Sequence, residues 1–417
     1  MIEFSFHTLS NGLRVIIHED WATPLAAVNL LYDVGSRDEN VSQTGFAHLF
    51  EHLMFGGSAH VPRFDEPLQQ AGGESNAFTT ADYTNYYMTL PANNIETAFW
   101  LESDRMGWLD VSDNALEVQR KVVVEEFRQR CLNQPYGDAW HLLRPLAYKV
   151  HPYRWPVIGL EPRHIEEARI DEVRSFHTRF YQPSNAILSV AGAIHTQQAL
   201  DLAEKWFGPI AGGIKPPRIL PQEPPQAAEG RLVTRADVPA PAMYKVFHMP
   251  ARNGSLYKSC DLLSDLLSGG RSSRLFLRLT KDRQIFSEVN AYLTGDMDPG
   301  LFVVTGKPAQ GVDYAEAEAA VAEELALISQ GLSERELEKV KNKFESHFLL
   351  EQTQIAQKAM TLGYYALLGD PALIHREIEA YRSVTEAEIS AAAEMLFRPA
   401  NSNTLWYLPA NQKNISL

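Results

Sequence analysis

Residues 42–58, SQTGFAHLFEHLMFGGS, contain two interleaved patterns of helical period. The apolar residues of the first pattern recur as they do on the buried face of an amphipathic helix. They are Phe46, Leu49, Phe50, Leu53 and Met54. Gly56 and Gly57 follow, and glycine commonly ends a helix. The sequence therefore predicts a short helix with one face packed into a core.

A second stripe on the same predicted helix carries His48, Glu51 and His52. Residues three and four apart leave a helix on one side, so two imidazoles and a carboxylate face the same way. Such imidazoles can bind one Zn²⁺, and the neighbouring carboxylate can take a proton from a water molecule at the metal. The pattern is an H-x-x-E-H signature. Because the chain has 13 His and 52 acidic residues in 417, about 0.05 chance occurrences are expected.

A catalytic zinc usually takes three protein ligands and keeps a fourth position for water. The helix-like segment DNALEVQRKVVVEEFRQR, residues 113–130, offers Glu125 and Glu126 as the third ligand. Adjacent residues point about 100° apart on a helix, so only one of the two carboxylates can face the metal. The helical pattern alone leaves this choice open.

The rest of the chain indicates two copies of one α+β unit. A proline-dense stretch from Gly212 to Gly230 has no sustained apolar period, as is common for linkers. On each side of it the sequence ends with a helical pattern, a proline turn and a strand pattern, with Pro183 and Pro399 at equivalent places. We expect two similar domains, each a mainly antiparallel sheet with helices packed on it. The predicted boundaries are 1–212 for the first domain, 213–229 for the linker and 230–417 for the second domain.

Local patterns add strands and a helix start to this outline. The segments LRVIIHE and LAAVNLLYDVG read as strands, and the alternating run from Asn76 to Leu90 reads as a strand or hairpin. Ser333 and Glu336 form a capping-box pattern ahead of a long amphipathic stretch that continues through Leu350.

Composition limits the partners and the compartment. A formal net charge of −14 argues against a phosphate-binding surface, so nucleic acid is not an expected partner. No window approaches the roughly 18 apolar residues of a membrane-spanning helix. The first residues show no basic start before an apolar run. We therefore expect a cytoplasmic protein as written, or a periplasmic or secreted one if an export signal was trimmed.

The chain resembles the pitrilysin family of zinc metallopeptidases, and especially its short branch related to mitochondrial processing peptidase. The segments that carry the resemblance follow the family's order. They are LSNGLRVIIHED, HLFEH, GGESNAFTTADYTNYYM, VVVEEFRQ, HPYRWPVIG and FYQPSNAILSVAG. The resemblance implies one zinc per chain held by His48, His52 and Glu126, with Glu51 as the catalytic base. A glutamate that the family places two helical turns before the third ligand is Gln119 here, and an amide there can still orient a ligand.

The resemblance also implies a binding place for a peptide substrate. Ser75, Asn76, Ala77 and Phe78 match a strand edge to which family members add an extended substrate segment. Such pairing uses backbone hydrogen bonds and makes little demand on the substrate's sequence. Without the resemblance, an ordinary solvent-facing strand would explain these residues equally well.

One family feature is missing from the second half. Complete enzymes of this family carry an Arg and a Tyr there, and the matching positions are Thr280 and Ser287. A shifted alignment offers Arg278 or Arg283 with Tyr292, at spacings that differ from the family's. We therefore expect a homologous partner chain to supply these groups.

The expected function is that of a zinc-dependent endopeptidase, as the zinc-bearing subunit of a heterodimer that cleaves peptides in a chamber between paired chains. A homodimer is the alternative assembly. Two other functions compete with this one. The chain could be a non-catalytic binding or assembly subunit of the same fold, or a metal hydrolase of another class that shares the motif by chance.

Overall fold

The computed structural model describes residues 2–410, which form two compact units. Unit 1 contains the chain up to Arg128 together with Trp155–Leu220 and Leu349–Arg376. Unit 2 contains Gln129–Arg154, Pro221–Phe348 and the chain from Glu377 onward. In the described part of the chain, no helix is long and apolar enough to cross a membrane.

These units differ from the contiguous domains that the linker predicts. Residues 129–154, which lie inside the predicted first domain, belong to unit 2. Residues 349–376, which lie inside the predicted second domain, belong to unit 1. The linker does coincide with a division of the chain, which falls between Leu220 and Pro221.

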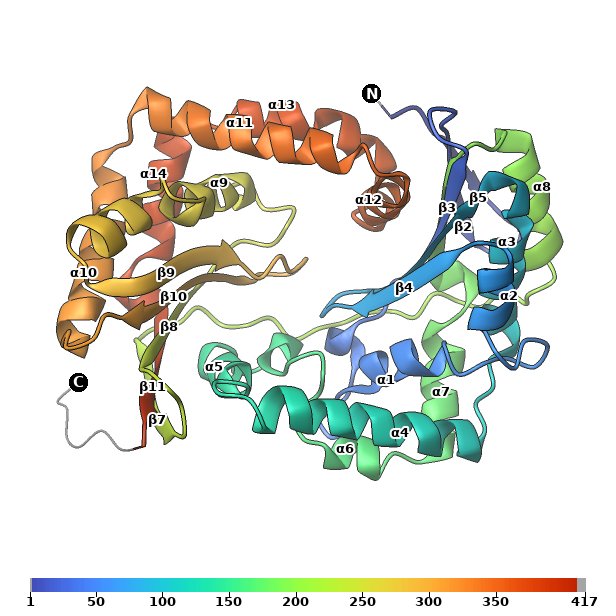
Figure 1. Ribbon diagram of the computed structural model, residues 1–417, viewed down its shortest axis with the longest axis horizontal. Coiled ribbons are helices and arrows are strands. Elements are labelled where there is room, and N and C mark those ends of the chain that lie inside the picture. Colours follow the sequence, from blue (N-terminus) through green and yellow to red (C-terminus); the bar gives the residue numbers. More distant parts are fainter. Residues whose placement is uncertain (1, 411–417) are drawn as a thin grey trace. The chain divides into compact units, whose positions relative to one another are not determined.

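Unit 1 is built on a six-stranded sheet in the order β1-β2-β6-β3-β5-β4. The strands are β1 (Ser5–Thr8), β2 (Arg14–Glu19), β3 (Leu25–Tyr32), β4 (Glu74–Thr79), β5 (Thr84–Pro91) and β6 (Ala186–Gly192). All neighbouring pairs are antiparallel except β2 and β6. Strand β4 is therefore an edge strand, paired only with β5 within this sheet (Figure 1).

Unit 2 repeats this arrangement with five strands in the order β7-β11-β8-β10-β9. The strands are β7 (Gly230–Ala236), β8 (Ala242–His248), β9 (Phe286–Leu293), β10 (Leu301–Pro308) and β11 (Ser402–Pro409). Again one pair, β7 with β11, is parallel and the others are antiparallel. Read in order, β2-β6-β3-β5-β4 of unit 1 matches β7-β11-β8-β10-β9 of unit 2 in every pairing direction. The predicted α+β class and the duplication are confirmed.

Several local predictions are also confirmed. The run from Asn76 to Leu90 forms the β4–β5 hairpin. Pro183 and Pro399 each open a 3₁₀ turn, η5 (Pro183–Asn185) and η9 (Pro399–Asn401), directly before β6 and β11. The Ser333 hydroxyl accepts a hydrogen bond from the Glu336 backbone N–H, and the Glu336 carboxylate accepts one from the Ser333 N–H. This capping box starts the long helix of unit 2.

Helices cover both faces of the first sheet. The helices of unit 1 are α1 (Phe46–Leu53), α2 (Asp65–Gln70), α3 (Glu96–Trp108), α4 (Asp113–Phe127), α6 (Arg163–Glu166), α7 (Ile170–Phe180), α8 (Thr196–Phe207) and α12 (Ile355–Leu367). Val28 and Leu30 of β3 point into the main core with α1, α3 and α8. Ala27 points the other way and packs against Ala359 of α12. Strand β3 is apolar along most of its length because both of its faces are buried.

The helices of unit 2 are α5 (Ala139–Ala147), α9 (Tyr257–Ser268), α10 (Tyr314–Ala326), α11 (Glu334–Glu351), α13 (Glu377–Arg382) and α14 (Glu386–Leu396). All of these helices except α5 contribute buried residues to a core separate from that of unit 1. The last residues of α11 pass into unit 1.

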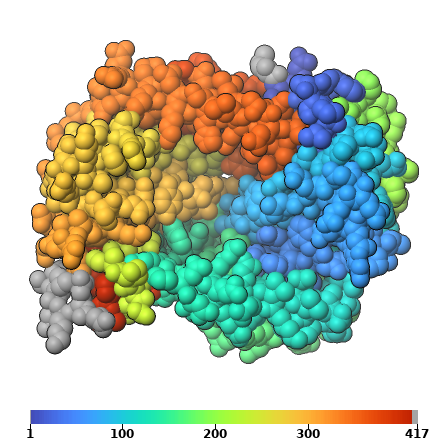
Figure 2. All heavy atoms as spheres, in the orientation of Figure 1, coloured from blue at the N-terminus to red at the C-terminus, as the bar shows by residue number. Residues whose placement is uncertain are grey.

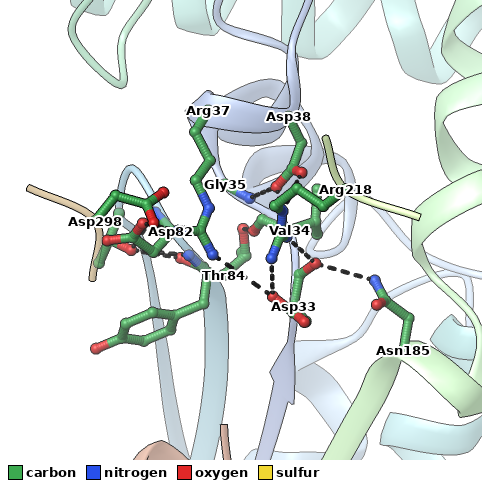
Figure 3. A network of polar contacts seen from close by, with 12 residues as sticks. Asp33, Val34, Gly35, Arg37, Asp38, Asp82, Thr84, Asn185, Arg218 and Asp298 are labelled. Atoms are coloured by element: carbon green, nitrogen blue, oxygen red, sulfur yellow. Dashed lines mark hydrogen bonds and ion pairs between the residues drawn. The ribbon is translucent and has the colours of Figure 1, made fainter. Parts of the chain in front are cut away.

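The proline-rich linker has no regular secondary structure, yet its first half is fixed to unit 1. The Arg218 guanidinium lies between Asp33 and Asp38, with Nη1 2.8 Å from Asp33 Oδ1 and Nε 2.7 Å from Asp38 Oδ1 (Figure 3). Lys215 Nζ is 2.6 Å from Asp33 Oδ2. Burial by itself raises the pKa of Asp33, but Arg218 and Lys215 together bring that pKa below its usual value. Asp33 is therefore buried as an ion because linker cations compensate it.

We expect Arg218→Met to destabilise unit 1 by about 3 kcal/mol, because the change leaves buried carboxylates without their main counter-ion. Lys215→Met is the matched control, since its ammonium is half-exposed, and we expect a loss below about 1 kcal/mol. Urea denaturation, with amide hydrogen exchange to isolate unit 1, measures both. Equal losses for the two variants would contradict the role assigned to Arg218.

Candidate metal centre

Helix α1 carries the H-x-x-E-H residues and is fixed at its first turn. The buried Glu39 carboxylate accepts hydrogen bonds from the backbone N–H groups of Gly45 and Ala47, each at 2.9 Å. These groups would otherwise lack partners, as the first N–H groups of any helix do. Burial raises the pKa of Glu39 well above its ordinary value, against the effect of these bonds. Gly45 has φ +91°, and a Cβ there would lie 3.0 Å from the Ile158 carbonyl oxygen, so glycine is required.

The apolar stripe of α1 is buried as predicted. The Phe50 ring stacks on the rings of Phe176 and Tyr181, with centroids 5.4 and 4.9 Å away. The His177 ring also stacks on the Tyr181 ring, and burial lowers the pKa of His177 to about 4. Its ring is therefore neutral at neutral pH and acts here as one more aromatic surface. This packing fixes which side of α1 faces away from the core.

On its other side, α1 presents His48 and His52 to a carboxylate of α4. His52 Nε2 lies 3.1 Å and His48 Nε2 lies 3.6 Å from Glu126 Oε2. The three ligand atoms lie within 4.8 Å of one another, and no other such group of three His, Cys, Asp or Glu occurs among residues 2–410. Zinc bound tetrahedrally at the usual bond lengths separates its ligand atoms by about 3.3 Å. The donors therefore fit a zinc ion in number and type, and the two distances to Glu126 Oε2 are close to this separation.

The packing of α4 decides between the two adjacent glutamates. Ser112 caps this helix by accepting a hydrogen bond from the Ala115 N–H. Its buried residues near the far end are Val123, Val124 and Phe127. With these residues inward, Glu126 turns toward the imidazoles, while Glu125 is exposed and lies 3.8 Å from Arg128. Val118 and Val122 of α4 are exposed. Residues of α4 contribute to the teal surface in Figure 2.

Gln119 lies on the same helix, half-buried and two turns before Glu126. It makes no hydrogen bond to His48 or His52 within the described residues. Its amide nitrogen lies near Gly56, because a Cβ built on that glycine would be 3.6 Å away. The orienting role expected for Gln119 therefore stays a prediction.

Glu51 has a partner that the sequence reasoning did not identify. The Thr79 hydroxyl donates a hydrogen bond of 2.6 Å to Glu51 Oε2. Thr79 is the last residue of β4, and α1 packs against this strand. The alternation of side chains along a strand could have identified Thr79 from the sequence, because it places Thr79 on the same face of β4 as the partly buried Ala77.

The predicted substrate residues Ser75, Asn76, Ala77 and Phe78 all lie on the edge strand β4. Asn76 is exposed, and its Oδ1 accepts a hydrogen bond of 2.8 Å from the Ala77 N–H. A side chain of the strand itself thus occupies one backbone donor. The structure places these residues where an added strand could pair, and substrate contact stays a prediction.

The positions discussed for the missing Arg and Tyr lie in unit 2. Thr280 is in η6 (Phe276–Asp282), and Ser287 on β9 donates to the Lys307 carbonyl oxygen. Arg278 and Arg283, offered by the shifted alignment, are 3.1 and 2.7 Å from carboxylates of Glu324 and Glu323 on α10. Both guanidinium groups are therefore already paired within unit 2. Tyr292 is on β9 and partly exposed.

The described residues combine a duplicated α+β fold with a cluster of two imidazoles and a carboxylate, and Glu51 lies beside that cluster. This combination is typical of zinc metallopeptidases, and comparison with known proteins gives the same class. Residues 14–141 match the family described as "Insulinase (Peptidase family M16)", and residues 168–344 match "Peptidase M16 inactive domain". The first match contains all the predicted metal ligands. The chain belongs to this M16 family, also called the pitrilysin family.

Individual relatives that match nearly the whole chain are also named as proteases. The zinc protease PqqE of Helicobacter pylori is 28% identical over 96% of this chain and 92% of its own length. The uncharacterized zinc protease YmxG of Bacillus subtilis is 24% identical over 94% of this chain and 95% of its own length. A crystal structure of a protease from Helicobacter pylori, 26% identical, superposes with a TM-score of 0.92 over 98% of this chain and 100% of that chain. These relatives are named as proteases, two of them as zinc proteases.

We expect Glu126→Gln to weaken zinc binding by more than about 100-fold, since losing a ligand should exceed the loss caused by changing a residue that only orients one. Glu125→Gln, the neighbouring change on α4, should bind zinc like the parent protein because Glu125 is exposed. Competition titration with a chelator of known affinity measures both constants. If the Glu125 variant were the one that lost zinc, the ligand set would have to change.

Proposed function

We propose that this protein is a zinc-dependent endopeptidase with His48, His52 and Glu126 as metal ligands and Glu51 as general base. The observation that carries the proposal is the convergence of these ligand atoms from α1 and α4 within 4.8 Å. The names of its relatives as zinc proteases support the same activity.

Zinc, when bound by these ligands, supplies a Lewis acid that polarises a carbonyl and makes water more acidic. Glu51 takes the proton of the attacking water and passes it to the nitrogen of the scissile bond as that bond breaks. His48 and His52 need their Nε2 atoms unprotonated to act as ligands. The buried apolar stripe of α1 holds these groups on one side of the helix, so they need little rearrangement when substrate arrives.

We propose that the substrate is an extended peptide or an unfolded segment that adds a strand to β4. Its backbone would take over the Ala77 N–H from Asn76 Oδ1, and Asn76 would then be free to bond the substrate backbone. Edge-strand addition explains how a peptidase can accept many sequences, because the recognised groups are common to every peptide.

We expect Glu51→Gln to lower kcat/KM by at least about 100-fold, because the amide cannot accept the proton of the attacking water. Zinc content should remain that of the parent protein, since Glu51 is not a ligand. Cleavage of a quenched fluorescent peptide and metal analysis of the same sample test this. Unchanged turnover at equal purity would refute the assignment of Glu51.

The proposal extends to the assembly of the active enzyme. The resemblance to the family places Thr280 and Ser287 where complete enzymes carry an Arg and a Tyr. Arg278 and Arg283, the nearby alternatives, are paired with Glu324 and Glu323 of α10. Losing one oxyanion donor typically costs about 10²–10³ in rate. We therefore propose that this chain is the zinc-bearing subunit of a heterodimer, with a homologous partner that supplies those donors in a shared chamber. A homodimer and a purely non-catalytic assembly subunit are the competing forms.

We expect the isolated zinc-loaded chain to cleave peptide slowly, and a homologous partner chain to raise kcat/KM by at least about 100-fold. Activity is measured for each chain alone and for the mixture, with the Glu51→Gln chain in the mixture as control. Full activity of the isolated chain would exclude the heterodimer. Failure of the mixture to cleave any peptide, with zinc bound, would favour the assembly subunit.

A further inference from the structure

The general base Glu51 is held by a residue from outside the metal-binding helix. The Thr79 hydroxyl donates to Glu51 Oε2 at 2.6 Å, a short bond of the kind that charged acceptors form. Both side chains are only partly buried. The bond joins the end of the edge strand β4 to α1. The Glu51 carboxylate is therefore held by two elements, α1 through its backbone and β4 through Thr79.

The hydrogen bond from Thr79 limits the conformations that the Glu51 side chain can adopt. A glutamate side chain has three rotatable bonds, and one exposed to solvent samples several rotamers. A hydroxyl bonded to Oε2 restricts the side chain to rotamers that keep that oxygen at β4. The second oxygen, Oε1, is then presented in a defined direction and stays available to accept a proton.

We propose that Thr79 is a positioning residue for the Glu51 carboxylate. This inference rests on the proposed peptidase function and adds to it the residue that aims the base. Ala77 and Thr79 are two residues apart on β4, so a peptide strand that pairs at Ala77 also contacts the backbone next to Thr79.

A structural role and a positioning role predict different outcomes. If Thr79 only completed the packing of β4 against α1, replacing its hydroxyl by a methyl group of similar size would change stability and leave turnover per folded molecule unchanged. If Thr79 positions Glu51, the same change lowers kcat while zinc content and KM are kept. Thr79→Ser keeps a hydroxyl and should restore most of kcat.

The variants are Thr79→Val, Thr79→Ala and Thr79→Ser. Thr89→Val on β5 is the matched control, because the Thr89 side chain makes no hydrogen bond within the described residues. The zinc-loaded full chain is assayed with its homologous partner where one is needed, on a quenched fluorescent unstructured peptide. Crystal structures of the zinc-loaded parent, Val and Ser forms show the position of the Glu51 carboxylate independently of activity.

We expect kcat to fall about 10–100-fold in Thr79→Val and Thr79→Ala, the cost of a lost hydrogen bond to a charged group. KM and zinc content should stay within about twofold, and Thr79→Ser should recover kcat. In the crystals, Glu51 should have one conformer in the parent and Ser forms and a displaced or divided one in the Val form. Thr89→Val should match the parent.

Parent-like kcat in both Thr79→Val and Thr79→Ala would overturn the proposal, as would an unmoved Glu51 in the Val crystal. Loss of zinc together with kcat would assign Thr79 to the fold of the metal site and overturn it as well. If the parent protein cleaves no peptide, the proposed function fails, and the position of Glu51 in the crystals still decides the role of Thr79.

Discussion

The packing of α1 against α4 is the contact on which the site depends, because it brings together ligand atoms that the chain separates widely. The aromatic stack around Phe50 opposes rotation of helix α1 about its axis. The hydrogen bonds from its first turn to the Glu39 carboxylate oppose sliding along the axis. Helix α4 is oriented by its own buried residues, which turn Glu126 and not Glu125 toward the imidazoles. The convergence of the candidate ligand atoms is thus a consequence of hydrophobic burial on two helices.

Features of the fold and of the candidate metal site can be predicted from the sequence where they depend on contacts between residues close together in the chain. The stripe of α1, the β4–β5 hairpin and the Ser333 cap follow from spacing within a few residues, and the structure has all of them. The choice of Glu126 could not be made from helical periodicity, because α4 has no clear apolar face and Val118 and Val122 are exposed. Which of the two glutamates faces the imidazoles depends on how α4 packs against α1, and that packing is a property of the tertiary structure.

The same reasoning explains the difference between the predicted domains and the compact units. A helical pattern shows that a segment has a buried face, but it does not show which sheet that face covers. Helix α12 comes from the second half of the sequence and packs on β3 and β6 of unit 1. Arg218 lies in a stretch whose composition predicts a loose linker, yet it bonds to Asp33 and Asp38. Ion pairs between residues so far apart leave no periodic signal, so sequence analysis could not identify them.

The duplication shows where fold and chemistry separate. Helices α1 and α9 follow equivalent strands and pack on equivalent edge strands, β4 and β9. Helix α9 has no histidine, and its sequence YKSCDLLSDLLS gives unit 2 no counterpart of the metal ligands among the described residues. The backbone arrangement is therefore not sufficient for a metal site. What distinguishes unit 1 among the described residues is the set of donors itself. The partly buried Glu126 carboxylate faces the Nε2 atoms of His48 and His52, and this is the donor set that the proposed zinc site requires.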